Sequence, residues 1–135
     1  MIGSNQFNMI KGIHHIAIIC SDFEKSKHFY CEVLGFKIIK ETFRQERQSY
    51  KLDLQLPDLT QIELFSFPNP PPRVSHPEAR GLRHLSFRVE KLEPIIERLH
   101  TFGIQTENIR IDEMTNRRFT FFMDPDQLPL ELYES

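Results

Sequence analysis

Two histidines and two glutamates occur at matching places in this sequence, and together they could hold one divalent metal ion. His15 and His84 are 69 residues apart, and Glu63 and Glu131 are 68 residues apart. Imidazole and carboxylate ligands together suit Zn²⁺, Ni²⁺, Co²⁺, Mn²⁺ or Fe²⁺, whereas Mg²⁺ and Ca²⁺ prefer shells made of oxygen. Each glutamate interrupts an apolar stretch, where a carboxylate is costly unless it is paired or bound to metal.

The spacing of these four residues belongs to an internal repeat. Other pairs follow the same offsets: Gly12 and Gly81, Phe23 and Leu92, and Gly35 and Gly103. Taken singly, each glutamate could point outward from a half-exposed strand and each histidine could be a satisfied core residue. Chance would have to place all four in register together, so the repeat favours a joint metal site.

Each half of the repeat predicts the element order β-α-β-β-β. Apolar and β-branched runs predict the strands, and apolar residues at helical spacing predict one helix per half. A Ser21–Glu24 capping box begins the first helix, and Gly35 and Gly103 fit the helix ends. In the first half, the expected strands are 13–20, 36–42, 49–55 and 61–67. In the second half, they are 82–89, 104–109, 117–123 and 130–133, and a helix is expected at 92–102.

The sequence therefore predicts an α+β fold built from two modules. The modules lie at about 11–67 and 81–135, and a connector at 68–80 with five of the nine prolines joins them. Neither half is long enough to bury a core alone, so both should pack within one domain at 11–135. Residues 1–10 carry little pattern and are expected to form a tail.

Composition narrows the function classes. The net charge of −2 gives no reason to expect nucleic acid or an anionic membrane as a partner. No apolar run approaches the length of a membrane helix, and the N-terminus lacks a signal-peptide pattern. Cys20 and Cys31 show no metal-binding or redox spacing and fit a reducing compartment. A cytoplasmic protein that acts on a small molecule is expected.

Several short segments carry a resemblance to a known superfamily. They are His14-His15-Ile16-Ala17 with Ser21-Asp22, Phe29-Tyr30 with Leu34-Gly35-Phe36, Ile62-Glu63-Leu64, Arg83-His84-Leu85, Phe122 to Asp126, and Leu130-Glu131-Leu132. Over residues 11–134 the chain resembles the vicinal-oxygen-chelate superfamily and, within it, glyoxalase I (lactoylglutathione lyase). The resemblance implies paired βαβββ modules that form a cupped mixed sheet, the glyoxalase/bleomycin-resistance/dioxygenase fold.

The resemblance also implies a site and an activity. His15, Glu63, His84 and Glu131 match the four metal ligands of glyoxalase I, with Ni²⁺ or Zn²⁺ as the expected metal. The implied enzyme is a lyase or isomerase that acts on a small α-oxo compound or its thiol hemithioacetal through an enediolate. Glu131 is the first candidate for the base and Glu63 the second. The resemblance also implies a homodimer. The sequence leaves open whether the four ligands of each site come from one chain or from both.

The substrate is less well defined. Ile19 and Phe67 stand where glyoxalase I has an arginine and an asparagine that hold glutathione. Phe67, Arg80 and Arg118 are the candidate substrate-binding residues. Three alternatives stay open: a thiol transferase of the fosfomycin-resistance type, an epimerase of the same superfamily, and a non-catalytic protein that sequesters a ligand.

Overall fold

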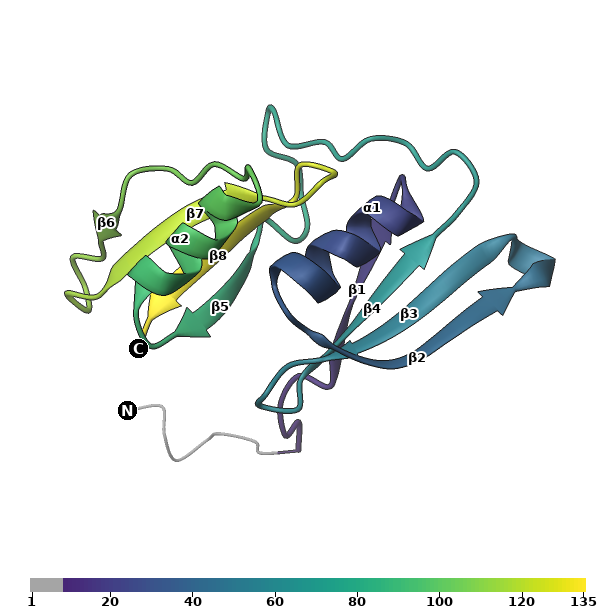
Figure 1. Cartoon of the computed structure of the whole chain (residues 1–135), viewed down its shortest axis with the longest axis horizontal. Helices are drawn as coiled ribbons and strands as arrows, with labels where there is room; N and C mark the ends of the chain where they lie inside the picture. Colours follow the sequence, from purple (N-terminus) through teal and green to yellow (C-terminus); the bar gives the residue numbers. More distant parts are fainter. Residues whose placement is uncertain (1–8) are drawn as a thin grey trace.

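The computed structural model describes residues 9–135; residues 1–8, most of the expected tail, lie outside the described part. Two four-stranded sheets lie side by side, with β2 and β6 at the outer ends of the molecule (Figure 1). The elements of the first half are β1 (His15–Cys20), α1 (Phe23–Lys27), the π-helix η2 (His28–Val33), β2 (Lys37–Arg44), the 3₁₀ turn η3 (Gln45–Arg47), β3 (Ser49–Gln55) and β4 (Gln61–Ser66). Those of the second half are β5 (Leu85–Val89), α2 (Leu92–Thr101), β6 (Arg110–Ile111), β7 (Arg118–Met123) and β8 (Pro129–Glu134).

The two sheets have the same topology, which confirms the predicted α+β class. Their strand orders are β1-β4-β3-β2 and β5-β8-β7-β6, and in each the first strand runs parallel to its neighbour. The repeat holds at the level of the hydrogen-bonded ladder. Ala17 pairs with Glu63 in the first sheet, and Ser86 pairs with Glu131 in the second. Residues that are separated by these offsets of 69 and 68 therefore occupy equivalent positions in the two sheets.

Alternation along the strands gives each sheet a buried face and an open face. The buried faces and the helices share one hydrophobic core, with Phe29 against Phe122 and Phe36 against Phe87. We call the opposite faces the open faces. The first open face carries His15, Ile19, Glu63, Phe65 and Lys51, and the second carries His84, Glu131, Phe119, Phe121 and Tyr133.

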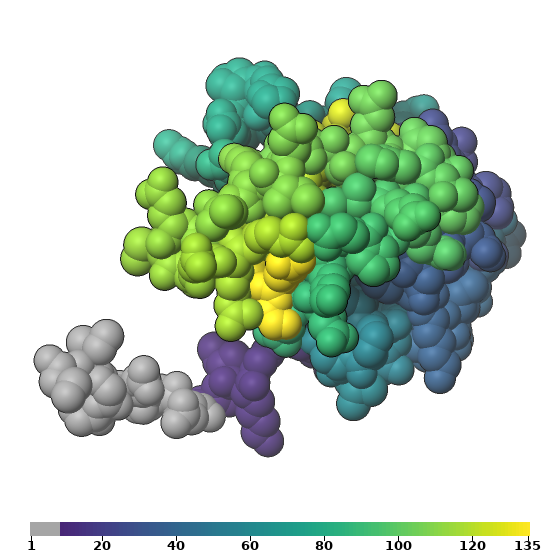
Figure 2. All heavy atoms as spheres, turned by 60° about the vertical axis from the view of Figure 1, so that its left-hand side comes forward, coloured from purple at the N-terminus to yellow at the C-terminus, as the bar shows by residue number. Residues whose placement is uncertain are grey.

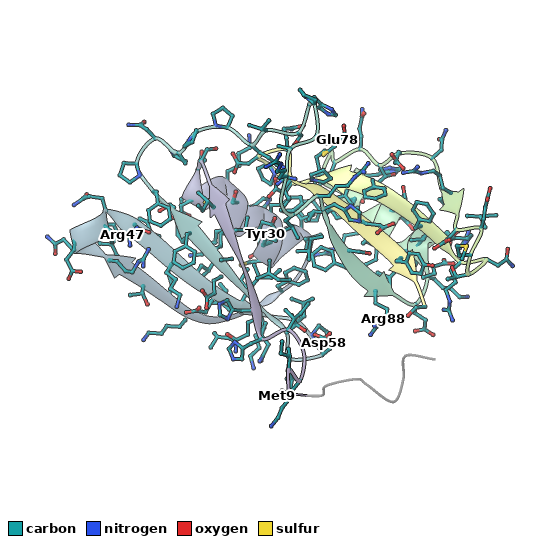
Figure 3. The ribbon with its side chains drawn as sticks, turned by 180° about the vertical axis from the view of Figure 1, so that it is seen from behind. Met9, Tyr30, Arg47, Asp58, Glu78 and Arg88 are labelled. Atoms are coloured by element: carbon teal, nitrogen blue, oxygen red, sulfur yellow. The ribbon has the colours of Figure 1, made fainter. Side chains whose placement is uncertain are left out.

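Hydrogen bonds between the halves fix how they pack. The Tyr30 hydroxyl donates to Asp124 Oδ2 at 2.7 Å, and Figure 3 shows Tyr30 between the two sheets. The Arg98 guanidinium on α2 donates to the carbonyl oxygens of Glu32 and Val33 at 2.7 and 2.8 Å. The π-helix η2 is thus bound to the second half by both polar and apolar contacts.

Three local predictions were wrong. The N-cap of α1 is Asp22, whose Oδ1 accepts from the Lys25 N–H, because the Ser21 side chain instead donates to the Asp126 carboxylate. The strand expected at 104–109 is absent, and the two-residue β6 follows at Arg110–Ile111. The strand expected from residue 82 begins only at Leu85, so that His84 directly precedes it.

The segment between β4 and β5 holds no helix or strand, as the prolines predicted. It projects from the body of the molecule in teal in Figure 2, and the first described residues project below it in purple. In the described range 9–135, no helix has the length and apolar character needed to span a membrane.

Candidate metal centre

The first pair of predicted ligands meets on the first open face. His15 lies two residues before Ala17, the ladder partner of Glu63, so both side chains leave the same face of two adjacent strands. His15 Nε2 is 3.6 Å from Glu63 Oε2. The other ring nitrogen, Nδ1, lies 3.0 Å from Nδ1 of His14, a contact that can orient the imidazole.

The second pair repeats this arrangement. His84 Nε2 is 3.3 Å from Glu131 Oε1. In both pairs the carboxylate side chain is mostly covered, at 16% exposed for Glu63 and 12% for Glu131, while the imidazoles are more open. Each pair therefore presents one nitrogen and one oxygen donor close together, at a place that a ligand can reach from the open face.

The surroundings of the two glutamates differ. Lys51 Nζ lies 3.8 Å from Glu63 Oε2 and 3.5 Å from Asp53 Oδ1, so a cation stands beside the first pair. Glu131 instead pairs across the strands with Phe121, whose ring meets the His84 ring edge-on at 5.0 Å. The first pair has a polar wall and the second an aromatic wall.

The two pairs do not meet within one chain. Among residues 9–135, no group of three or more His, Cys, Asp or Glu side chains is placed to hold one metal ion. Both pairs lie on open faces, and the element η2 packs between the halves on the buried side. The described chain thus places the four predicted ligands in two separate His–Glu pairs, which we call the first and second half-sites.

Large apolar side chains stand exposed close to both half-sites. Ile13, two residues before His15, is 69% exposed, and Ile19, four residues after it, is 54% exposed. Leu82, two residues before His84, is 57% exposed. Exposed apolar residues gathered around a polar site commonly mark a contact surface. Apolar side chains are thus exposed to water within four residues of each predicted histidine ligand.

Arg118 does not contact the second half-site. Because Phe119 and Phe121 occupy the open face of β7, Arg118 leaves the strand on the helix side. Its guanidinium donates to Glu93 at 2.8 Å and to Glu134 at 2.6 Å. These hydrogen bonds hold the pKa of Glu93 at about 2, well below its usual range. Arg118 thus tethers α2 to β8, and its part in substrate binding stays a prediction.

The other two substrate candidates lie in different settings. Phe67 stacks on Phe65 with ring centroids 5.9 Å apart, at the end of the first open face. Arg80 is exposed in the connector and makes no hydrogen bond or ion pair with residues 9–135. Sequence reasoning missed Arg44 and Lys51, which also occupy the first open face; alternation along β2 and β3 could have placed both there.

A hollow of about 400 Å³ lies between the halves, away from both half-sites. It is bounded by the turn after η2, the turn after β3, β5 and α2, and its wall is mainly apolar. None of the four predicted ligands lines it. The hollow is therefore separate from both His–Glu pairs.

The paired βαβββ sheets and their two His–Glu pairs define the class of protein. Residues 12–132 match the Glyoxalase/Bleomycin resistance protein/Dioxygenase superfamily, and the chain belongs to that superfamily. The chain is 64% identical over 126 residues to the uncharacterized protein YwkD of Bacillus subtilis (strain 168). This alignment covers 93% of the present chain and 98% of YwkD.

Two solved structures show how far the fold extends. The glyoxalase family protein from Enterococcus faecalis is 48% identical, with a TM-score of 0.85 over 92% of this chain and 98% of that one. A mutant of FosX from Listeria monocytogenes, a fosfomycin resistance protein, shares the fold at 19% identity, with a TM-score of 0.74 over 94% of each chain. That mutant was solved with Mn(II) and 1S,2S-dihydroxypropylphosphonic acid.

Proposed function

We propose that this protein is a metal-dependent lyase or isomerase of the glyoxalase I type that acts as a homodimer. Each site joins His15 and Glu63 of one chain to His84 and Glu131 of the other. Its substrate is a small α-oxo compound or the hemithioacetal that such a compound forms with a thiol. One observation carries the proposal: two His–Glu pairs occupy equal ladder positions on two open faces, and a single chain does not bring them together in its described range, 9–135.

A second copy of the chain is the partner that completes both half-sites at once. In a two-fold dimer, the first half-site of one chain meets the second half-site of the other, and symmetry repeats this contact. The exposed Ile13, Ile19 and Leu82 would lose their contact with water at such an interface. Strands β1 and β5 also each have one edge that pairs with no other strand of residues 9–135.

The donor set fits a divalent metal such as Ni²⁺ or Zn²⁺, because two imidazoles and two carboxylates leave room for two neighbouring substrate oxygens. When bound, the metal supplies Lewis-acid polarisation of the substrate carbonyl. The FosX mutant, which shares this fold, was solved in complex with Mn(II). The chain's own residues must then move the proton on the carbon next to that carbonyl.

Glu131 is the better placed of the two glutamates to take that proton. Glu63 has the Lys51 ammonium 3.8 Å away, an ionic partner that holds its carboxylate in place. Glu131 has an imidazole and an aromatic ring as its neighbours, with no ammonium or guanidinium within 4.0 Å in the described chain. A carboxylate without a second ionic partner is freer to move toward the substrate.

Mixing two inactive variants tests the shared site. One variant carries His15→Ala with Glu63→Gln, and the other carries His84→Ala with Glu131→Gln. Neither variant alone should bind Ni²⁺ or Zn²⁺ tightly, because every site lacks one pair. After subunit exchange, half of the dimers should be mixed and each should hold one complete site, so that metal content rises to roughly a quarter of the wild-type value.

The outcomes separate the parts of the proposal. No gain of metal on mixing, with exchange verified by mass labels, would show that sites are not shared between chains. Wild-type protein that holds neither metal after dialysis would overturn the site itself. Assay of the methylglyoxal–glutathione adduct with the bound metal then tests the substrate; no turnover would exclude a glutathione hemithioacetal and leave other α-oxo compounds.

A further inference from the structure

The first open face carries a positive charge that no acidic residue of the described chain neutralises. Arg44 ends β2, and its Cζ lies 4.8 Å from the ring centroid of Phe65 and 5.7 Å from that of Phe67. Its Nη2 donates to Ser49 Oγ at 3.0 Å. Its Nε–H group is buried and has no hydrogen-bond acceptor among residues 9–135. A guanidinium held against rings with so few acceptors loses hydration that the described chain does not replace.

Arg47 adds to this charge. It lies in η3, at the far end of the first sheet in Figure 3, and its Cζ is 5.2 Å from the Phe67 ring centroid. Within residues 9–135, no carboxylate oxygen comes within 4.0 Å of Arg44 or Arg47. Two guanidinium groups and two stacked rings therefore form one patch, which we call the Arg44 patch (Arg44, Arg47, Phe65 and Phe67).

The second open face provides an internal comparison. Arg110 lies over Phe119 and Phe121 at 5.0 and 5.4 Å, in the same kind of cation–ring contact. Its Nη2, however, is 2.7 Å from Glu107 Oε2. The arginine on the second open face is thus neutralised by the chain itself, whereas Arg44 on the first is not neutralised by any described residue. Ring contact alone does not explain why Arg44 lacks an acidic partner there.

The Arg44 patch lies beside the first half-site. Phe65 follows Glu63 by two residues on the same strand and the same face, which places the ring roughly 7 Å farther along the strand. A molecule that reaches both would be small. Its reacting carbonyl would lie at Glu63, its apolar part on the rings of Phe65 and Phe67, and its far end at Arg44.

We propose that the substrate carries an anionic group, a carboxylate or a phosphonate-type oxyanion, and that Arg44 binds it with help from Arg47. This inference rests on the proposed function, since it names the class of α-oxo compound that the site takes. A planar guanidinium with free N–H groups suits either anion, because both present two oxygens to its fork. The rings add contact with the carbon skeleton and hold the guanidinium in position.

Binding of simple anions to metal-free protein tests this proposal separately from catalysis. The full chain, treated with EDTA, is titrated with phenylacetate, with phenylphosphonate and with uncharged phenylacetamide while NMR shifts are followed. The two anions should bind and the amide should not. Arg44→Met should weaken anion binding about tenfold or more, the loss expected for a charge-assisted hydrogen bond. A preference between the two anions identifies the oxyanion.

Two further variants serve as controls for the loss of an arginine. Arg110→Met removes an arginine from the same kind of ring contact and should leave anion affinity within about twofold, because Glu107 already neutralises that charge. Arg44→Lys should fall between wild type and Arg44→Met. Wild-type protein that binds neither anion, or an Arg44→Met protein that binds them like wild type, would overturn the proposal.

The metal content of Arg44→Met distinguishes this inference from the proposed function. It should equal that of wild type, since Arg44 is not a ligand. Anion binding without any metal binding in wild type would remove the metal-dependent function and keep the anion site. Metal binding without anion binding in wild type would remove the anion site and keep the metal-dependent function.

Discussion

The hydrogen bond between Tyr30 and Asp124 should be one of the strongest single polar links between the two halves. The Tyr30 hydroxyl donates to Asp124 Oδ2 at 2.7 Å, and the two residues are 0% and 3% exposed. Tyr30→Phe removes only the hydroxyl oxygen and leaves the ring packing in place. Asp124 would keep two backbone donors to Oδ1, the N–H groups of Asp126 and Leu128 at 2.8 and 2.9 Å.

The expected loss in the free energy of unfolding is about 2 kcal/mol, because a buried hydrogen bond to a charged group contributes about 1.5–3 kcal/mol. At about 2–4 °C per kcal/mol for a chain near this size, the melting temperature should fall by roughly 6 °C. Apolar burial changes little, so the dependence of unfolding on urea concentration should keep its slope.

The loss should also depend on pH. Burial raises the pKa of Asp124 above its usual range, and the hydrogen bond from Tyr30 opposes that rise. A carboxyl group whose pKa is raised by folding favours the folded state while protonated, so this stability is lost as pH rises through the folded pKa. Without the Tyr30 hydroxyl the pKa should rise further. The destabilisation should therefore be larger at pH 7 than below about pH 4.

Urea unfolding of wild type and Tyr30→Phe at about pH 3 and at pH 7, at one fixed protein concentration, measures both effects. Tyr50→Phe is the matched control, because the Tyr50 hydroxyl makes no hydrogen bond with the described residues and the side chain is 38% exposed. It should change stability by less than about 0.5 kcal/mol. Equal losses for Tyr30→Phe at the two pH values would refute the reasoning about the ionised carboxylate.

Two further predictions concern the site and the surface. Glu131→Gln should keep part of the bound metal and lower turnover by about 10²–10⁴-fold, and Glu63→Gln should lower it less; full activity in Glu131→Gln would exclude it as the base. In Arg118→Met, the free energy of unfolding should fall less steeply than in wild type as pH is lowered below about 5. Arg118 lowers the pKa of Glu93 to about 2 and lowers that of Glu134, so their stabilisation is present above their unfolded values and lost as pH falls through the folded ones. An unchanged acid transition would contradict this role.

The wrong local predictions share one cause, which is competition from residues far away in the sequence. Ser21 and Glu24 have the spacing of a capping box, yet Asp126, 105 residues away, takes the Ser21 side chain and leaves the cap to Asp22. In 104–109, Ile104 packs against the core, and two isolated hydrogen bonds hold Glu107 to Thr120 and Phe121. These contacts hold the segment beside β7 without a ladder.

The direction of the Arg118 side chain likewise depended on residues far away in the sequence. Its place on a strand next to Glu131 could be predicted, but its face depended on which residues of β7 turn toward the core. Thr120 and Phe122 are buried, and Arg118 shares their side of the strand, where Glu93 of α2 meets it. A run such as Arg118-Phe119-Thr120-Phe121-Phe122 has aromatic residues on both faces, so its pattern does not choose between them.

The sequence by itself determined the repeat, the fold class and the matching positions of His15 with His84 and of Glu63 with Glu131. These follow from local periods and from equal offsets, since side chains alternate along a strand and equal segments form equal ladders. Only the tertiary structure decided that, over residues 9–135, the two His–Glu pairs stay apart within one chain and Arg44 lacks an acidic partner whereas Arg110 has one. Such outcomes depend on how whole sheets and helices pack, and no local spacing encodes that packing.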